Sequence, residues 1–343
     1  MPLARWMRRL CLAGVVLCFA VVVLGAYVRL TAAGLGCPDW PGCYGHATPL
    51  GAEHSAAALS HYPGRPLDAG KAWREMIHRY AAGTLALLIV ALAALAFAAR
   101  TARPSPMLAV ALLATVIVQA LLGMLTVTWQ LKPLVVTLHL LFGMTTLGLL
   151  WWLALSVPVS SWGAASLESA GRSRRGGALA SGPARSLALL GLAALGVQIA
   201  LGGWTSSNYA AIACPDFPTC QHAWWPHGDF RHAFVLWHGL DIDYEGGALA
   251  IPARVAIHFT HRLGALAASV ALAVAALYVV RHRGLGAARL RAWAVLGALL
   301  LQLILGVSMV LKGFPLWLAT AHTAGAALLL LAVLALLRSL SVR

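Results

Sequence analysis

The sequence has 343 residues, of which 61% are hydrophobic and only 10% are charged, whereas soluble domains carry roughly one quarter charged residues. This composition excludes a water-soluble globular protein and indicates a chain whose main solvent is lipid. The net charge of +15 at pH 7 raises the question of a nucleic-acid partner, which the placement of the basic residues can answer.

Apolar runs of about 20 residues recur along the whole chain, and a helix of that length crosses the roughly 30 Å hydrocarbon core of a bilayer. The sequence therefore predicts an all-α integral membrane protein. The first run is long and no small-residue cleavage site follows it, so we expect a retained helix there rather than a signal peptide. The eight expected spans cover residues 10–30, 76–98, 107–128, 134–155, 186–206, 253–280, 292–311 and 315–337.

The basic residues outside these runs fall on one side of the membrane. With both termini placed in the cytoplasm, the cytoplasmic segments hold arginine clusters such as residues 5–9, and every acidic residue except Glu168 falls on the other side. The positive-inside rule accounts for this asymmetry, so we expect contact with membrane lipid and no nucleic acid. The long loops at 31–75 and 207–252 then face outward, and the setting is a bacterial inner (cytoplasmic) membrane.

The chain contains an internal repeat, which appears when the sequence is laid over itself at two offsets. At offset 177, Cys37-Pro-Asp-Trp-Pro-Gly-Cys43 aligns with Cys214-Pro-Asp-Phe-Pro-Thr-Cys220. At offset 183 the aligned pairs are His78 with His261, Arg79 with Arg262, Gln119 with Gln302, and His139 with His322.

This repeat predicts two tandem four-helix bundles with the same orientation in the membrane, because each unit has an even number of spans. The N-terminal half covers residues 1–165 and the C-terminal half covers 186–343. Between them, residues 166–185 contain a stretch rich in Gly, Ser and Arg that predicts a cytoplasmic linker.

Four histidines fall within the expected helices at matching positions, and ionisable groups inside a membrane are candidates for function. His78 and His139 lie on helices that both run inward from the outer face, so their rings can hold one planar haem from opposite sides. His261 and His322 can do the same in the second half. The alternative is four histidines satisfied by hydrogen bonds between helices; the duplication of the pair favours ligation.

The residues beside these histidines suggest further roles. Arg79 and Arg262 each follow the first histidine of a half, where they could bind a haem propionate or extend to lipid phosphates. Glu75 lies one helical turn before His78 on the same face, and its equivalent in the second half is His258. Glu75 is therefore a candidate for chemistry at the first site, with a helix cap at the membrane interface as the alternative.

The paired cysteines lie in the outward loops, where oxidation is permitted. We expect the disulfides Cys37–Cys43 and Cys214–Cys220, with either a structural or a redox role. Cys11 and Cys18 lie in the first span and should pack as small apolar residues.

The motif Glu75-Met-Ile-His78-Arg79, the other three histidines and the two cysteine loops closely resemble the haem A synthase family over nearly the whole chain. The resemblance implies an oxidoreductase that oxidises the C8 methyl group of haem O to a formyl group, giving haem A for terminal oxidases. It implies a haem b cofactor in the C-terminal half and haem O, or the product haem A, in the N-terminal half. The family's catalytic glutamate falls on Glu75.

A protein of another class would use the same ligands. A bis-histidine b-type cytochrome would carry electrons through the membrane without modifying a substrate; the glutamate found in one half only and the outward cysteine pairs favour the enzyme. For the enzyme, expected partners are haem O as substrate, the haem O synthase that makes it, and assembly factors of terminal oxidases.

Overall fold

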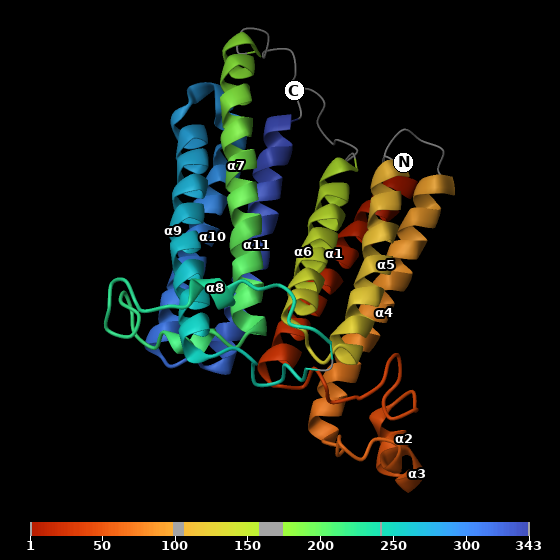
Figure 1. Ribbon diagram of the computed structural model, residues 1–343. Helices are drawn as coiled ribbons and strands as arrows, with labels where there is room; N and C mark the ends of the chain where they lie inside the picture. The colour runs from red at the N-terminus through yellow and green to blue at the C-terminus, as the bar shows by residue number, and fades with distance from the viewer. Residues whose placement is uncertain (1, 99–105, 158–173, 241, 342–343) are drawn as a thin grey trace.

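The computed structural model describes residues 2–98, 106–157, 174–240 and 242–341, and this part of the chain is helical apart from loops and two isolated β-bridges (Figure 1). The long helices are α1 (Pro2–Leu30), α4 (Ala69–Ala98), α5 (Pro106–Thr128), α6 (Pro133–Ser156), α7 (Arg174–Ser207), α9 (Ile251–Arg281), α10 (Gly286–Leu311) and α11 (Leu316–Ser341). The short ones are α2 (Pro49–Glu53), α3 (Ala56–Ser60) and α8 (Phe230–Ala233), with 3-10 turns at Ala211–Ala213 and Arg283–Leu285.

Within the described residues, 8 helices are long and apolar enough to cross a membrane, so the prediction of an all-α multi-pass membrane protein is confirmed. The second of them begins earlier than the expected residue 76. Helix α4 starts at Ala69, because the Asp68 carboxylate accepts a hydrogen bond from the Lys71 amide at 3.0 Å and so satisfies a free donor of the first turn. Glu75 therefore lies inside the helix.

The region expected to be a linker is partly helical. Residues 166–173 lie outside the described residues, and helix α7 begins at Arg174, so the expected linker overlaps the first turns of this helix. Its role as the boundary between the halves stays a prediction. Ala, Leu and Arg are good helix formers, and they alternate with the Gly and Ser residues that suggested a flexible segment. The membrane-spanning part of α7 begins at Gly182.

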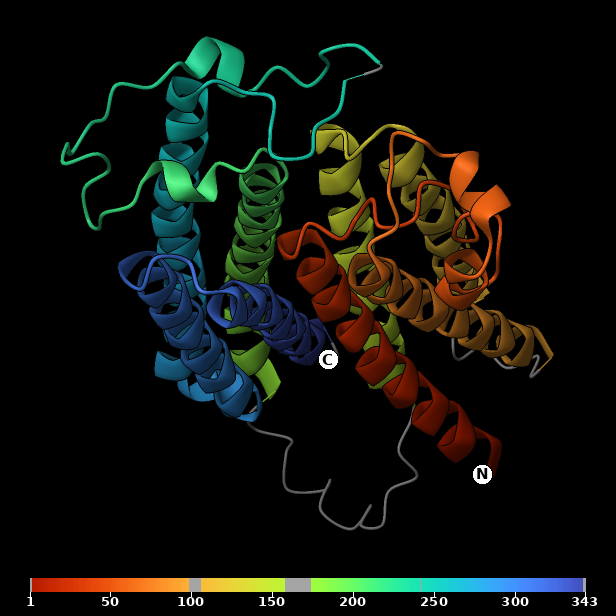
Figure 2. The same cartoon turned by 90° about the horizontal axis from the view of Figure 1, so that it is seen from below.

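The helices contact one another in two closed sets. In the first half α1 packs on α4 and α6, while α5 packs on α4 and α6. In the second half α7 packs on α9 and α11, and α10 packs on α9 and α11. Viewed from the loop end, the helices of each half group together (Figure 2). These neighbours are compatible with two tandem four-helix bundles.

The two halves meet along α1 and α6 on one side and α7 and α11 on the other. Arg29 of α1 donates to the Ser206 carbonyl at 2.5 Å, and the Trp151 indole of α6 donates to the Leu331 carbonyl at 2.9 Å. One apolar cluster runs through both halves. Cys11 and Cys18 are buried free thiols within it, as predicted.

Both cysteine loops lie at one end of the helices, and the first and last helices place the chain ends at the other (Figure 1). The second loop also reaches over the first half. Arg65 forms ion pairs with Asp243 at 2.9 Å and Glu245 at 3.1 Å. Lys132, at the start of α6, donates to the Gly239 carbonyl and lies 3.1 Å from the ring centroid of Trp237. The loop therefore joins the outer ends of the halves.

Candidate functional site

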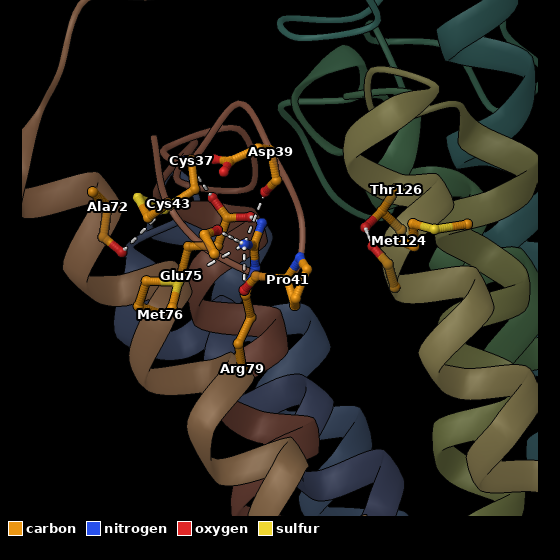
Figure 3. A network of polar contacts seen from close by, with 12 residues as sticks. Cys37, Asp39, Pro41, Cys43, Ala72, Glu75, Met76, Arg79, Met124 and Thr126 are labelled. Carbon is orange, nitrogen blue, oxygen red and sulfur yellow. Dashed lines mark hydrogen bonds and ion pairs between the residues drawn. A yellow bond between two sulfur atoms is a disulfide. The ribbon is translucent and has the colours of Figure 1, made fainter. Parts of the chain in front are cut away.

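Glu75 connects helix α4 to the first cysteine loop. Its side chain is only 5% exposed, and one carboxylate oxygen accepts a hydrogen bond from the Cys37 amide at 2.8 Å. The other oxygen forms an ion pair with Arg79 at 2.6 Å, one turn further along the helix (Figure 3). Asp68 accepts from the Lys71 amide in the first turn of α4, whereas Glu75 lies further along the helix and binds Cys37 and Arg79.

Arg79 binds the same loop through its guanidinium group. It donates to the carbonyl oxygens of Asp39 at 2.9 Å and Gly42 at 2.5 Å, while a second nitrogen binds Glu75. Figure 3 shows these contacts converging from α4 onto the loop that holds the disulfide. Arg79 thus fixes the loop against the helix that carries His78. Its expected contact with a haem propionate stays a prediction.

The second half has a similar arrangement, in which an arginine again binds two carbonyl oxygens of the cysteine loop. Arg262 donates to the carbonyl oxygens of Thr219 at 2.7 Å and Cys214 at 2.9 Å, and Thr219 occupies the position equivalent to Gly42. In place of the glutamate, buried His258 accepts a hydrogen bond from Arg262 at 3.3 Å. We call Arg79 and Arg262, each with the loop carbonyls that it binds, the arginine clamps. The side chain next to the clamp is a carboxylate in the first half and an imidazole in the second.

The two cysteine loops share a fold. Cys37 is bonded to Cys43 and Cys214 to Cys220, so the predicted disulfide pairing is confirmed. In both loops the second cysteine forms an isolated antiparallel bridge with the residue three positions further on. The loops thus reproduce the sequence repeat in their backbone structure.

An aspartate closes each loop by binding the backbone amides five and six positions later. The distances are 2.6 and 2.8 Å for Asp39, and 2.7 and 3.0 Å for Asp216. Burial raises the pKa of the Asp216 carboxyl, but hydrogen bonds from the Thr219 hydroxyl and the His222 and Gln221 amides outweigh burial and hold the pKa at about 2. Asp216 is therefore ionised at any physiological pH.

The disulfides lead to a labelling prediction. In protein denatured without reductant, only Cys11 and Cys18 should react with a thiol reagent, because the remaining cysteines are bonded in pairs; reduction should raise the count to all 6 cysteines. Mass analysis of the labelled protein measures both states. A Cys11→Ser, Cys18→Ser variant serves as the control and should show no labelling before reduction. Labelling of all the loop cysteines without reductant would contradict the pairing.

The histidines of the first half pack against neighbouring helices at glycines. A Cβ atom on Gly25 of α1 would lie 3.0 Å from Cε1 of His78, and one on Gly123 of α5 would lie 3.4 Å from Cε1 of His139. A side chain at Gly25 would therefore crowd the His78 ring, whereas one at Gly123 would make an ordinary contact with the His139 ring. The rings of His78 and His139 are also near enough for their charges to interact.

The second half has the same packing at equivalent positions. A Cβ atom on Gly202 of α7 would lie 3.2 Å from Cε1 of His261, and one on Gly306 of α10 would lie 3.0 Å from Cε1 of His322. His261 and His322 are again near enough for their charges to interact. The structure therefore brings the predicted histidines together as two pairs, each ring held by a glycine on the next helix.

The surroundings of the histidine pairs suit a metal ion that is already bound within a cofactor and needs few protein ligands. Among the described residues, no group of three or more His, Cys, Asp or Glu side chains could hold a metal ion, whereas zinc or copper sites usually need such a group. A haem leaves only axial positions to the protein. In the described chain, Nδ1 of His139 and of His322 is buried without a hydrogen-bond partner. The residues present therefore fit haem ligation.

One polar neighbour escaped the sequence reasoning. The amide of Gln198 in α7 lies 3.0 Å from Nδ1 of His261. Gln198 aligns with Val21 at offset 177. A polar residue within a span, aligned with an apolar one in the other half, was the signal that could have identified it. The amide of Gln302, which did appear in the repeat, lies 3.3 Å from Nε2 of His322.

The fold and these contacts define a class of protein: a multi-pass helical membrane protein with a matched histidine pair in each half and one buried glutamate in the first half. The model of the cytochrome oxidase assembly protein family matches residues 8–334. The chain is 40% identical to a haem A synthase of Shewanella oneidensis, over 95% of this chain and 93% of that protein.

Other relatives agree. A haem A synthase of Methylobacterium radiotolerans is 30% identical over 88% of this chain and 81% of its own length, and one of Caulobacter vibrioides is 28% identical over 91% and 89%. The chain belongs to the haem A synthase family, within the cytochrome oxidase assembly proteins. The resemblance drawn from the sequence motifs is confirmed.

Proposed function

We propose that this protein is a haem A synthase, an oxidoreductase that converts the C8 methyl group of haem O to a formyl group and so supplies haem A to terminal oxidases. The match to relatives of that name over nearly the whole chain supports the reaction. One observation supports the assignment of different roles to the two halves. The arginine clamps are equivalent, but Glu75 lies beside one and His258 beside the other.

The substrate site is assigned to the first half. His78 and His139 would hold haem O there as axial ligands, and Glu75 lies one turn before His78 on the same face of α4. Oxidation of the methyl carbon removes electrons and protons. A carboxylate in a buried site can accept a proton or stabilise positive charge developing on the carbon, so Glu75 is assigned the chemical role.

The cofactor site is assigned to the second half, where His261 and His322 would hold a haem b. When bound, that haem would supply electron transfer. The chain's own contribution is to fix the two rings, through glycines on the adjacent helices and glutamine amides beside both histidines. The absence of a carboxylate at position 258 leaves this half without an equivalent of Glu75.

The clamps would hold the outer ends of both sites. Arg79 and Arg262 bind the cysteine loops from the helices that carry His78 and His261, and the same guanidinium groups are assigned to the haem propionates. The loops then cover the haem sites from the outer side of a bacterial inner membrane, with both termini cytoplasmic. Haem O synthase and factors that assemble terminal oxidases are the proposed protein partners.

The test is the haem content of cells that lack their own haem A synthase but make haem O. Expression of this chain should yield haem A, identified by mass after acid extraction from the purified protein. A His54→Ala variant, which removes a histidine exposed on the first loop, is the matched control and should also yield haem A. Recovery of haem b alone, with haem O unchanged in the membrane, would instead support a b-type electron-transfer cytochrome.

A further inference from the structure

Gln198 contacts a proposed haem ligand through its side chain, and the aligned residue of the first half, Val21, has an apolar side chain. The amide nitrogen of Gln198 lies 3.0 Å from Nδ1 of His261 and also donates to the carbonyl oxygen of His261 at 3.0 Å. The amide oxygen is buried and has no hydrogen-bond partner in the described part of the chain. Space for this amide comes from Gly264, where a Cβ atom would lie 2.5 Å from the amide oxygen.

The equivalent positions in the first half have changed together. Gln198 aligns with Val21 at offset 177, and Gly264 aligns with Ala81 at offset 183. The side chain of valine cannot bind an imidazole nitrogen, so only the backbone of Val21 can reach the His78 ring. The methyl group of alanine occupies the space that the amide needs. The glutamine and its glycine therefore form one feature of the second half, and both parts of it are missing beside His78.

The contact has a defined effect on a ligating histidine. An imidazole that binds iron through Nε2 carries its proton on Nδ1, and the partner of Nδ1 fixes the tautomer and the ring orientation. An amide offers a donor and an acceptor in one plane, so a half turn of the Gln198 amide presents its unpaired oxygen to Nδ1–H. This turn exchanges the hydrogen bond to the His261 carbonyl for one that accepts from the ring. Such an acceptor also makes the imidazole a stronger electron donor.

We propose that Gln198 is a positioning residue for His261 which makes the second half the retentive haem site, whereas the first half, with Val21 and Ala81, releases its haem more readily. This inference rests on the proposed function, in which the second haem is a resident cofactor and the first is a substrate that must leave as product. The difference in retention follows from the side-chain contact at Nδ1 of His261, which the valine side chain cannot make at His78.

The experiment compares full-length protein with Gln198→Val, which installs the residue of the first half, and with Gly264→Ala, which should push the amide away from the ring. Haem transfer to excess apomyoglobin measures retention, and a redox titration measures the midpoint potential of the low-spin haem. Retention in the second half should fall about 10- to 100-fold in both variants. The midpoint potential should rise, because a weaker imidazole donor stabilises ferric iron less.

Two further variants separate the possible failures. Val21→Gln is the matched control and should leave the retention and potential of the second haem unchanged. If His261→Ala removes the haem but both Gln198→Val and Gly264→Ala leave retention and potential at the parental values, the positioning role is wrong and the proposed function stands. If His261→Ala keeps an unchanged low-spin haem, the ligand assignment and this inference are both wrong. Gly264→Ala keeps the test available if Gln198→Val does not fold.

Discussion

Replacement of Glu75 by Gln is expected to stop or stall the reaction while both haem sites stay assembled. Glutamine keeps an oxygen that can accept from the Cys37 amide, but it has no charge to pair with Arg79 and cannot take up a proton. Formation of haem A should fall by about 10²- to 10⁴-fold, the usual contribution of a positioned acid or base. Extracted haem should then consist of haem b with haem O or a partly oxidised alcohol, identified by mass.

The matched control is His258→Ala, which alters the equivalent position of the second half. It should still form haem A, since the chemistry is assigned to the carboxylate. Retention of haem distinguishes a chemical from a structural role for Glu75, because collapse of the loop contact would release haem as well as stop turnover. Normal haem A from Glu75→Gln would refute the assignment of separate roles to the two halves.

Replacement of His261 or His322 by Ala should remove the resident low-spin haem. In the proposed cofactor site each histidine would hold the haem iron through an imidazole nitrogen, and alanine has no group that could replace it. The low-spin signal of the b haem should disappear from optical and electron paramagnetic resonance spectra, and pyridine haemochrome analysis should show its loss. The equivalent changes at His78 and His139 should instead abolish retention of haem O.

The control for these variants is His227→Ala, which changes a histidine exposed on the second loop and should leave the spectra as they are. Folding is checked by circular dichroism of the purified variants, which should keep the helical content of the parent protein. An unchanged low-spin spectrum in both His261→Ala and His322→Ala would show that these residues are not the ligands.

The sequence by itself determined the membrane class, the number of spans and the pairing of the loop cysteines. These features follow from local composition and from the repeat: an apolar run of about 20 residues has few stable alternatives to a transmembrane helix, and cysteines six positions apart in an outward loop are already close. The family could likewise be read from Glu75, the four histidines and the cysteine loops. The paired histidines are 61 residues apart in both halves, and the paired cysteines are 6 apart in both loops.

Only the tertiary structure decided the partners of those residues. The contacts of Glu75 with the Cys37 amide, of Arg79 with loop carbonyls and of Gln198 with His261 join positions far apart in the chain. They depend on backbone groups and on helix packing, which side-chain patterns do not encode. The start of α4 at Ala69 likewise depends on a cap in a polar segment outside the apolar run. Hydropathy identifies the part of a helix that lipid surrounds, whereas hydrogen bonds in the folded chain decide where the helix begins.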